Sequence, residues 1–153
     1  MKEHDFEFNL AYTSMLKRAL WTYHTIADEL DLHWMEHRKD WRLNEKHYGA
    51  LQGLQKDVEH NRHFNLKQLK EWRNTFIGAG PGLNKNDFRH PIHDRKYYGI
   101  VHPDALPKVE SMKDCMQRTL PFWENQVVRN IYKDKQILIV SHKNTLRAIF
   151  THI

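Results

Sequence analysis

The run Lys135-Gln136-Ile137-Leu138-Ile139-Val140-Ser141-His142 contains the clearest strand in the sequence. Its four consecutive apolar residues are typical of a strand buried on both faces, as the inner strands of a parallel sheet are. The polar turn Ser141-His142-Lys143-Asn144 follows, and residues 145–153 then have the pattern of a helix. Because α/β proteins bind ligands where a parallel strand gives way to the next helix, this stretch predicts an α/β fold with a site at His142.

Other segments supply further elements of that fold. Residues 8–12 predict a short strand, and residues 14–31 an amphipathic helix with Thr13 or Ser14 as its N-cap. Residues 34–41 are ambiguous, with an extended edge segment as one interpretation, and residues 42–64 predict a structured loop with a short helix. A helix around residues 66–76 ends at the glycines of residues 78–82, and an irregular stretch follows to residue 107. The last long helix, residues 110–132, contains Pro121 and is therefore expected to kink or break.

The charge balance and the cysteine count narrow the class of protein. The chain has 153 residues, the size of one domain, and 24 Lys and Arg against 19 Asp and Glu give it a net charge of +5. A basic surface suits phosphate-bearing partners, whether metabolites or nucleic acid, and does not choose between them. Cys115 is the only cysteine, so an intramolecular disulfide is excluded and a reducing compartment is favoured. Without an apolar run near ~20 residues or a secretory signal, we expect a cytoplasmic protein with no membrane partner.

Four residues could carry chemistry on their local pattern. Glu45 lies among cationic and aromatic neighbours, where a carboxylate can donate or accept a proton near bound phosphate; a salt-bridged loop acid is the alternative. His142 ends the apolar strand, and a hydrogen-bonded structural histidine is its alternative. Arg18 and Arg73 lie on predicted helices, where each could clamp a phosphate or form a surface ion pair.

Several histidine pairs raise the question of zinc. The pairs with helical or near-helical spacing are His33/His37, His60/His63 and His90/His93. None has a cysteine partner or a third ligand at the spacing of a known zinc motif. We therefore expect no metal.

Six runs occur in an order that is specific to one family. They are Ala11–Ala19 (AYTSMLKRA), Trp41–Gly53 (WRLNEKHYGALQG), Glu71–Arg73 (EWR), Glu110–Asp114 (ESMKD), Leu120–Trp123 (LPFW) and Ser141–Ala148 (SHKNTLRA). Together they make the chain resemble the cofactor-dependent phosphoglycerate mutases of the histidine phosphatase superfamily. The resemblance extends over essentially the whole chain.

The resemblance implies a fold, a reaction and a set of site residues. The fold is a phosphoglycerate mutase-like α/β sandwich around a mostly parallel sheet. The reaction is the interconversion of 2- and 3-phosphoglycerate in glycolysis, primed by 2,3-bisphosphoglycerate and passing through a phosphohistidine. Glu45 would be the proton donor and acceptor, and His142 would stabilise the transferring phosphoryl group. Substrate-binding residues would be Arg18, Lys46, His47, Tyr48, Lys56, Arg73, Asn74, Lys143 and Asn144. A small phosphorylated substrate and, by family analogy, a second copy of the chain in a homodimer are the implied partners.

The sequence also departs from the family pattern. The family opens with an Arg-His-Gly strand end that carries the nucleophile. By the resemblance, residues 1–153 are expected to form a single partial domain that lacks this first strand and also the family's C-terminal region. Lys46 and Asn74 stand where the family usually has arginine, and Lys143 where it has glycine. A catalytically inactive remnant that only binds anions is therefore the alternative function. A basic nucleic-acid-binding module is a second alternative, although no aromatic platform or recognition motif supports it.

Overall fold

The computed structural model describes residues 6–55 and 62–153, and in them strands alternate with helices. The strands are β1 (Leu10–Thr13), β2 (Glu36–Lys39) and β3 (Ile137–Val140). The α-helices are α1 (Lys17–Leu30), α3 (Leu66–Asn74), α4 (Met112–Phe122), α5 (Arg129–Ile131) and α6 (Lys143–Phe150). Two compact units result: Met1–Glu45 with Met116–Ile153, and Lys46–Cys115. Within the described residues, no helix combines the length and the apolar character needed to cross a membrane.

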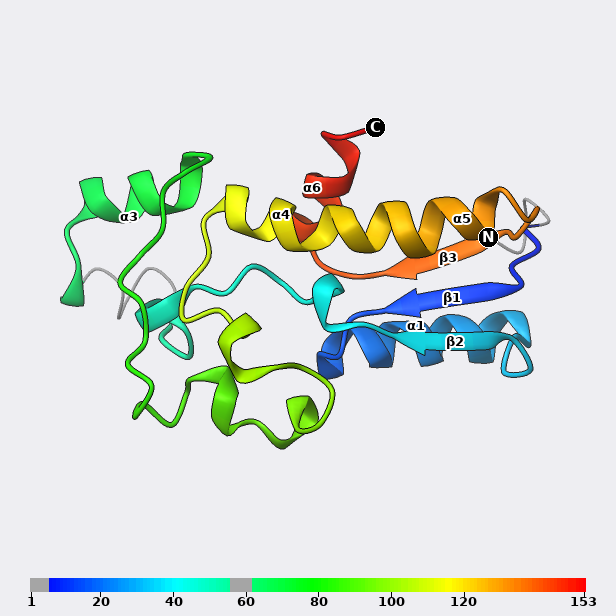
Figure 1. The fold of residues 1–153 in the computed structure, drawn as a ribbon, viewed down its shortest axis with the longest axis horizontal. Helices are drawn as coiled ribbons and strands as arrows, with labels where there is room; N and C mark the ends of the chain where they lie inside the picture. Colours follow the sequence, from blue (N-terminus) through cyan, green and yellow to red (C-terminus); the bar gives the residue numbers. More distant parts are fainter. Residues whose placement is uncertain (1–5, 56–61) are drawn as a thin grey trace. The chain divides into compact units, whose positions relative to one another are not determined.

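The first unit is built on a three-stranded parallel sheet with the order β2-β1-β3 (Figure 1). The central strand places Tyr12 beside Arg38 on one side and beside Ile139 on the other. Parallel strands require a crossover, and α1 provides it between β1 and β2. The predicted α/β fold with a parallel sheet is confirmed, and the ambiguous residues 34–41 contain its charged edge strand.

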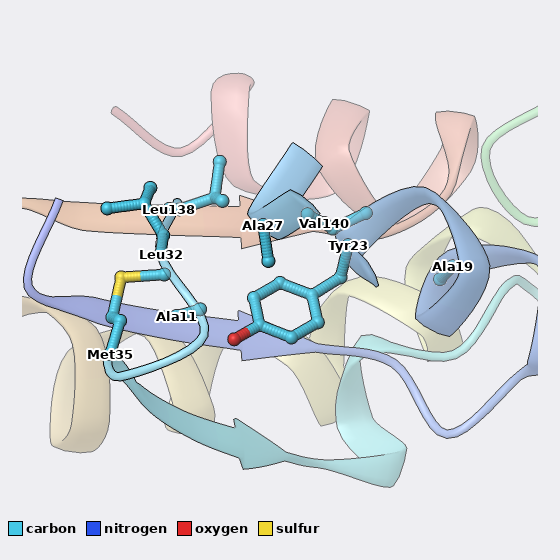
Figure 2. Close-up of a cluster of buried hydrophobic side chains, with 8 residues drawn as sticks. All are labelled: Ala11, Ala19, Tyr23, Ala27, Leu32, Met35, Leu138 and Val140. Carbon is cyan, nitrogen blue, oxygen red and sulfur yellow. The ribbon is translucent and has the colours of Figure 1, made fainter. Parts of the chain in front are cut away.

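One face of the sheet is covered by α1. Ala11 of β1 and Leu138 and Val140 of β3 point toward this helix, which contributes Ala19, Tyr23 and Ala27 to the same cluster (Figure 2). The small residues of α1 let the helix approach the strands closely, and Tyr23 fills the remaining space. Leu32 and Met35, which follow the helix, close the cluster.

The opposite face is covered by the C-terminal helices. Leu10 and Tyr12 of β1 pack with Phe122, Val127 and Ile149, and the rings of Tyr12 and Phe122 meet edge to face at 5.2 Å between centroids. Ile137 and Ile139 of β3 pack against this second cluster. The run Ile137–Val140 is therefore apolar throughout because its alternate side chains meet two different helical layers.

Two details differ from the prediction. The N-cap of α1 is Leu16, whereas Ser14 bonds the backbone N–H of Leu16 through its Oγ at 3.2 Å, just before the helix. The Ser14 hydroxyl also contacts the ring of His142, and this tertiary contact takes the place of the predicted N-cap role. The regular α-helix α4 ends one residue after Pro121, and a π-helical segment, η7 (Trp123–Val128), continues the helix into α5. The irregularity expected at the proline therefore takes the form of a π-helix and not of a break. A wider turn next to the missing proline N–H keeps the chain helical.

The second unit contains α3 and short 3-10 turns. The turns are η3 (Gly49–Leu51), η4 (Pro91–His93), η5 (Arg95–Tyr97) and η6 (Pro103–Ala105), while η2 (Trp41–Leu43) belongs to the first unit. His90, Asp94 and His102 cap the turns that follow them by accepting a backbone N–H two residues on. The second half of the predicted irregular stretch over residues 78–107 is thus a series of capped turns, and His90 caps the first of them.

Candidate functional site

His142 lies at the end of β3, directly before α6, and is buried. Two side chains from the chain segment after β1 contact its ring. The Oγ of Ser14 is 2.7 Å from Nε2, and Nε of Arg18 donates a hydrogen bond to Nδ1 at 3.0 Å. These contacts form because β1 and β3 are parallel neighbours, so that their carboxyl ends, and the turns that follow, meet at one edge of the sheet.

The contacts define the protonation state of the ring. A guanidinium can only donate, so Nδ1 must be an acceptor and the proton of the neutral imidazole lies on Nε2, from which Ser14 Oγ accepts. Burial, together with the positive charges of Arg18 and Arg118, lowers the pKa of His142 from 6.5 to about 4. His142 is therefore a neutral ring in a region of positive potential.

Glu45 lies at the end of the loop that follows η2 and is partly buried. The residue before it, Asn44, accepts the backbone N–H of Met15 on its side-chain oxygen at 2.8 Å. The hydroxyl of Thr145 donates to the Asn44 carbonyl, and that of Ser141 to the Leu43 carbonyl, each at 2.6 Å. Ser141 and Thr145 flank the His142 turn, so the loop of Glu45 and the turn of His142 are bonded to each other within one unit.

The remaining predicted residues of the first unit lie on α6. Asn144 is partly buried in the first turn of that helix, and Lys143 is exposed at its start. Of the predicted residues, Arg18 and His142 are in direct contact, and Glu45 and Asn144 belong to the same unit.

The second unit holds most of the other predicted residues. Lys46 is 4% exposed; its Nζ donates to the Trp72 carbonyl at 3.3 Å and lies 5.2 Å from the ring centre of Tyr48. His47 is tied to Glu110 twice, because its N–H donates to the carboxylate and its carbonyl accepts the Glu110 N–H, both at 2.8 Å. These contacts fix the backbone of the segment that carries the family motif.

Arg73 and Asn74 end helix α3, with Arg73 partly buried and Asn74 exposed. Lys56 lies outside the described residues. Among the residues described, no three histidine, cysteine, aspartate or glutamate side chains gather as a metal site would require. The thiol of Cys115 is buried.

Four residues of this region escaped prediction. Ser14, Ser141 and Thr145 had a weak signal, since each lies in a motif already identified, either just after a strand or in the first turn of the helix that follows it. Arg118 had none, because nothing in the sequence connects a helical arginine with the carbonyls of a loop some 70 residues earlier.

Comparisons with known proteins identify the family. The family model described as "Histidine phosphatase superfamily (branch 1)" matches residues 1–94 and 64–153. The chain belongs to this superfamily. This member of the histidine phosphatase superfamily has a parallel sheet with a buried histidine, His142, at the carboxyl end of β3.

The relatives extend beyond the part of the fold seen here. Two proteins named 2,3-bisphosphoglycerate-dependent phosphoglycerate mutase, from Nitrosococcus oceani and Elusimicrobium minutum, are each 39% identical over the whole chain. The chain spans 63% and 61% of their lengths. Among solved structures, Bacillus stearothermophilus YhfR is 20% identical with a TM-score of 0.65, covering 99% of this chain and 59% of its own. A mycobacterial hydrolase is 21% identical with a TM-score of 0.64, covering 95% and 58%. These structures support the α/β fold.

Proposed function

We propose that these residues form the phosphoryl-binding and proton-transfer part of a 2,3-bisphosphoglycerate-dependent phosphoglycerate mutase. The observation that carries the proposal is the contact of Arg18 and Ser14 with the two ring nitrogens of a buried, neutral His142. Relatives that bear this activity in their names are 39% identical over the full chain. Because the chain spans less than two thirds of those relatives, the reaction and its substrates are proposed for the protein as a whole.

The donor set around His142 suits a phosphoryl group. Arg18 is exposed and its contact with His142 uses Nε alone, so its terminal nitrogens can bind phosphate oxygens through the planar fork. Burial lowers the pKa of His142, and the positive charges of Arg18 and Arg118 lower it further. A dianionic phosphoryl group would offset this positive potential. Phosphate binding would therefore raise the pKa of His142. To donate a hydrogen bond to the phosphoryl group as charge develops on it, the ring would exchange its contact with Ser14 or Arg18 for one with a phosphoryl oxygen.

Glu45 would move the proton at the substrate hydroxyl. A carboxylate serves as acid and base when it is held within hydrogen-bond reach of the reacting group, and the loop of Glu45 is bonded to the His142 turn. When bound, 2,3-bisphosphoglycerate would supply the phosphoryl group that primes the reaction. Proposed substrate-binding residues are Arg18, Lys46, His47, Tyr48, Lys56, Arg73, Asn74, Lys143 and Asn144. Glycolysis, the cytoplasm and a homodimer complete the proposal.

A coupled assay for 2-phosphoglycerate, started from 3-phosphoglycerate and primed with 2,3-bisphosphoglycerate, tests the proposed activity. In the protein as a whole, which would supply the nucleophile, we expect turnover that Glu45→Gln abolishes; from residues 1–153 alone we expect none. Phosphate binding is measured separately, by NMR titration of the His142 ring with inorganic phosphate. We expect Arg18→Met to remove the response and Arg38→Met, an exposed arginine on β2, to retain it.

The two measurements separate the candidate functions. Binding at His142 without turnover would assign the chain anion binding alone. Turnover that persists in Glu45→Gln would contradict the assigned role of Glu45. An unchanged His142 spectrum in excess phosphate would contradict the proposed site itself.

A further inference from the structure

Four consecutive backbone carbonyls, those of Arg42, Leu43, Asn44 and Glu45, accept hydrogen bonds from distant side chains. Ser141 and Thr145 hold two of them, as described above, and Thr119 Oγ1 donates to the Arg42 carbonyl at 3.1 Å. Most loop carbonyls bond to water or to nearby backbone. A loop whose successive carbonyls are all held by side chains is fixed in its position.

Arg118 makes the largest contribution to this arrangement. Its Nη1 donates to the Arg42 carbonyl at 2.6 Å, and its Nη2 donates to the carbonyls of Asn44 at 2.9 Å and Glu45 at 3.3 Å. The guanidinium also lies 5.8 Å from the ring centre of Trp41, at the start of the same segment. A planar fork can reach several carbonyls at once, whereas the ammonium of a lysine is a single compact donor group.

The same arginine also influences His142. Its positive charge is one of the three causes that lower the pKa of the His142 ring. Asn44, whose carbonyl Arg118 holds, accepts the N–H of Met15 and so connects the loop to the segment that leads into the helix of Arg18. Arg118 is therefore bonded to the loop of Glu45 and acts electrostatically on His142.

We propose that Arg118 is a positioning residue, which fixes the backbone of Glu45 relative to the His142 turn. The effect of Arg118 on turnover rests on the function proposed for Glu45. The effect of Arg118 on the position of the loop does not depend on that function. Placing an acid or base in its reactive geometry in advance is worth large factors in rate, so loosening this loop lowers kcat more than it weakens substrate binding.

Hydrogen exchange of the 153-residue chain, measured by NMR, tests the positioning role. Leu43 and Asn44 donate their N–H groups to the carbonyls of Asp40 and Trp41, and these amides report on the loop. We expect them to exchange about tenfold faster in Arg118→Lys and Arg118→Met, while the amides of β1 and α1 keep their rates. Arg129→Met, an exposed arginine on α5, is the control and leaves the loop unchanged.

A titration of His142 separates the charge of Arg118 from its fork. Arg118→Met removes the charge and raises the pKa of His142, whereas Arg118→Lys retains the charge and leaves that pKa close to its original value. In the mutase assay, Arg118→Lys lowers kcat about tenfold and leaves KM within about twofold.

Wild-type exchange at Leu43 and Asn44 in Arg118→Lys would overturn the proposal, as would faster exchange spread evenly over the chain. If Arg118→Met does not fold, Arg118→Lys alone decides between these outcomes. If the protein as a whole shows no mutase turnover, the proposed function fails. The exchange result for the loop of Glu45 does not depend on turnover and tests the positioning role by itself.

Discussion

Ser14 shows how one buried hydroxyl can serve two partners. It accepts the N–H of Leu16 ahead of α1 and contacts Nε2 of His142, so the same residue connects the helix of Arg18 with the ring that Arg18 contacts. Ser14 is fully buried, and the buried ring of His142 could not turn to water if the hydroxyl were removed. At this scale, the geometry of the candidate site depends on a residue that has no acid, base or phosphate-binding role of its own.

Ser14→Ala is expected to lower the free energy of unfolding by about 1–3 kcal/mol, because it leaves the buried Nε2–H of His142 without its acceptor. Chemical denaturation measures the loss. Thr25→Ala is a matched control: its hydroxyl is exposed and bonds within α1, so a change within about 0.5 kcal/mol is expected. Equal effects of the two substitutions would show that the contact between Ser14 and His142 does not stabilise the fold.

The elements differ in what holds them. The sheet of the first unit is stabilised by apolar contacts on both faces, one with α1 and one with the C-terminal helices. The turns of the second unit are instead held by capping side chains and by backbone conformation. One substitution in each unit tests this distinction.

In the first unit, Phe122→Ala is expected to lower the free energy of unfolding by about 3–5 kcal/mol, since it empties the centre of the cluster around Tyr12. Phe122 is 1% exposed, whereas Phe150 on α6 is 74% exposed. Phe150→Ala therefore serves as the control and changes stability by less than about 1 kcal/mol. A loss below 1 kcal/mol for Phe122→Ala would contradict the packing described for this face.

In the second unit, Gly49 combines a left-handed backbone conformation with a close contact that leaves no room for a side chain. Gly53 has the left-handed conformation without the close contact, so comparing the two glycines separates these effects. Gly49 has φ of +59°, and a Cβ there would lie 2.2 Å from the Pro81 carbonyl oxygen; Gly53 has φ of +81° and open space around it. Gly53→Ala should cost about 1 kcal/mol for backbone strain alone. Gly49→Ala adds the clash and should cost clearly more in the same denaturation experiment. Equal losses would show that the turn moves freely to accommodate the methyl group.

At the scale of the whole molecule, buried histidines connect stability to pH. Burial is the main cause that lowers the pKa of His37, His90 and His142 below 6.5. A lowered pKa means that the unfolded chain binds a proton that the folded chain does not. Between about pH 6.5 and 4, acidification therefore favours unfolding. The carboxyls of Asp87 and Asp114, whose pKa values are lowered from 3.8 by hydrogen bonds, act only at lower pH.

The free energy of unfolding is expected to fall as pH is lowered from 6.5 to 4, with His142 contributing up to about 1.4 kcal/mol per pH unit. Urea denaturation at a series of pH values measures the slope. His142→Gln should flatten it. A slope that does not change in His142→Gln would contradict the lowered pKa.

The sequence by itself determined the α/β class, the buried strand Ile137–Val140, the helices on either side and the family motifs around Glu45 and His142. Each of these predictions follows from a local pattern. Apolar periodicity, the glycines and prolines that end helices, and the short family motifs can each be recognised within a few consecutive residues. Only the tertiary structure decided that Ser14 contacts His142 rather than capping α1, and that Arg118 holds the loop of Glu45. Such contacts join residues more than 70 positions apart. Ser14 meets His142 because parallel strands bring distant turns to one edge of the sheet, and Arg118 reaches the loop from helix α4.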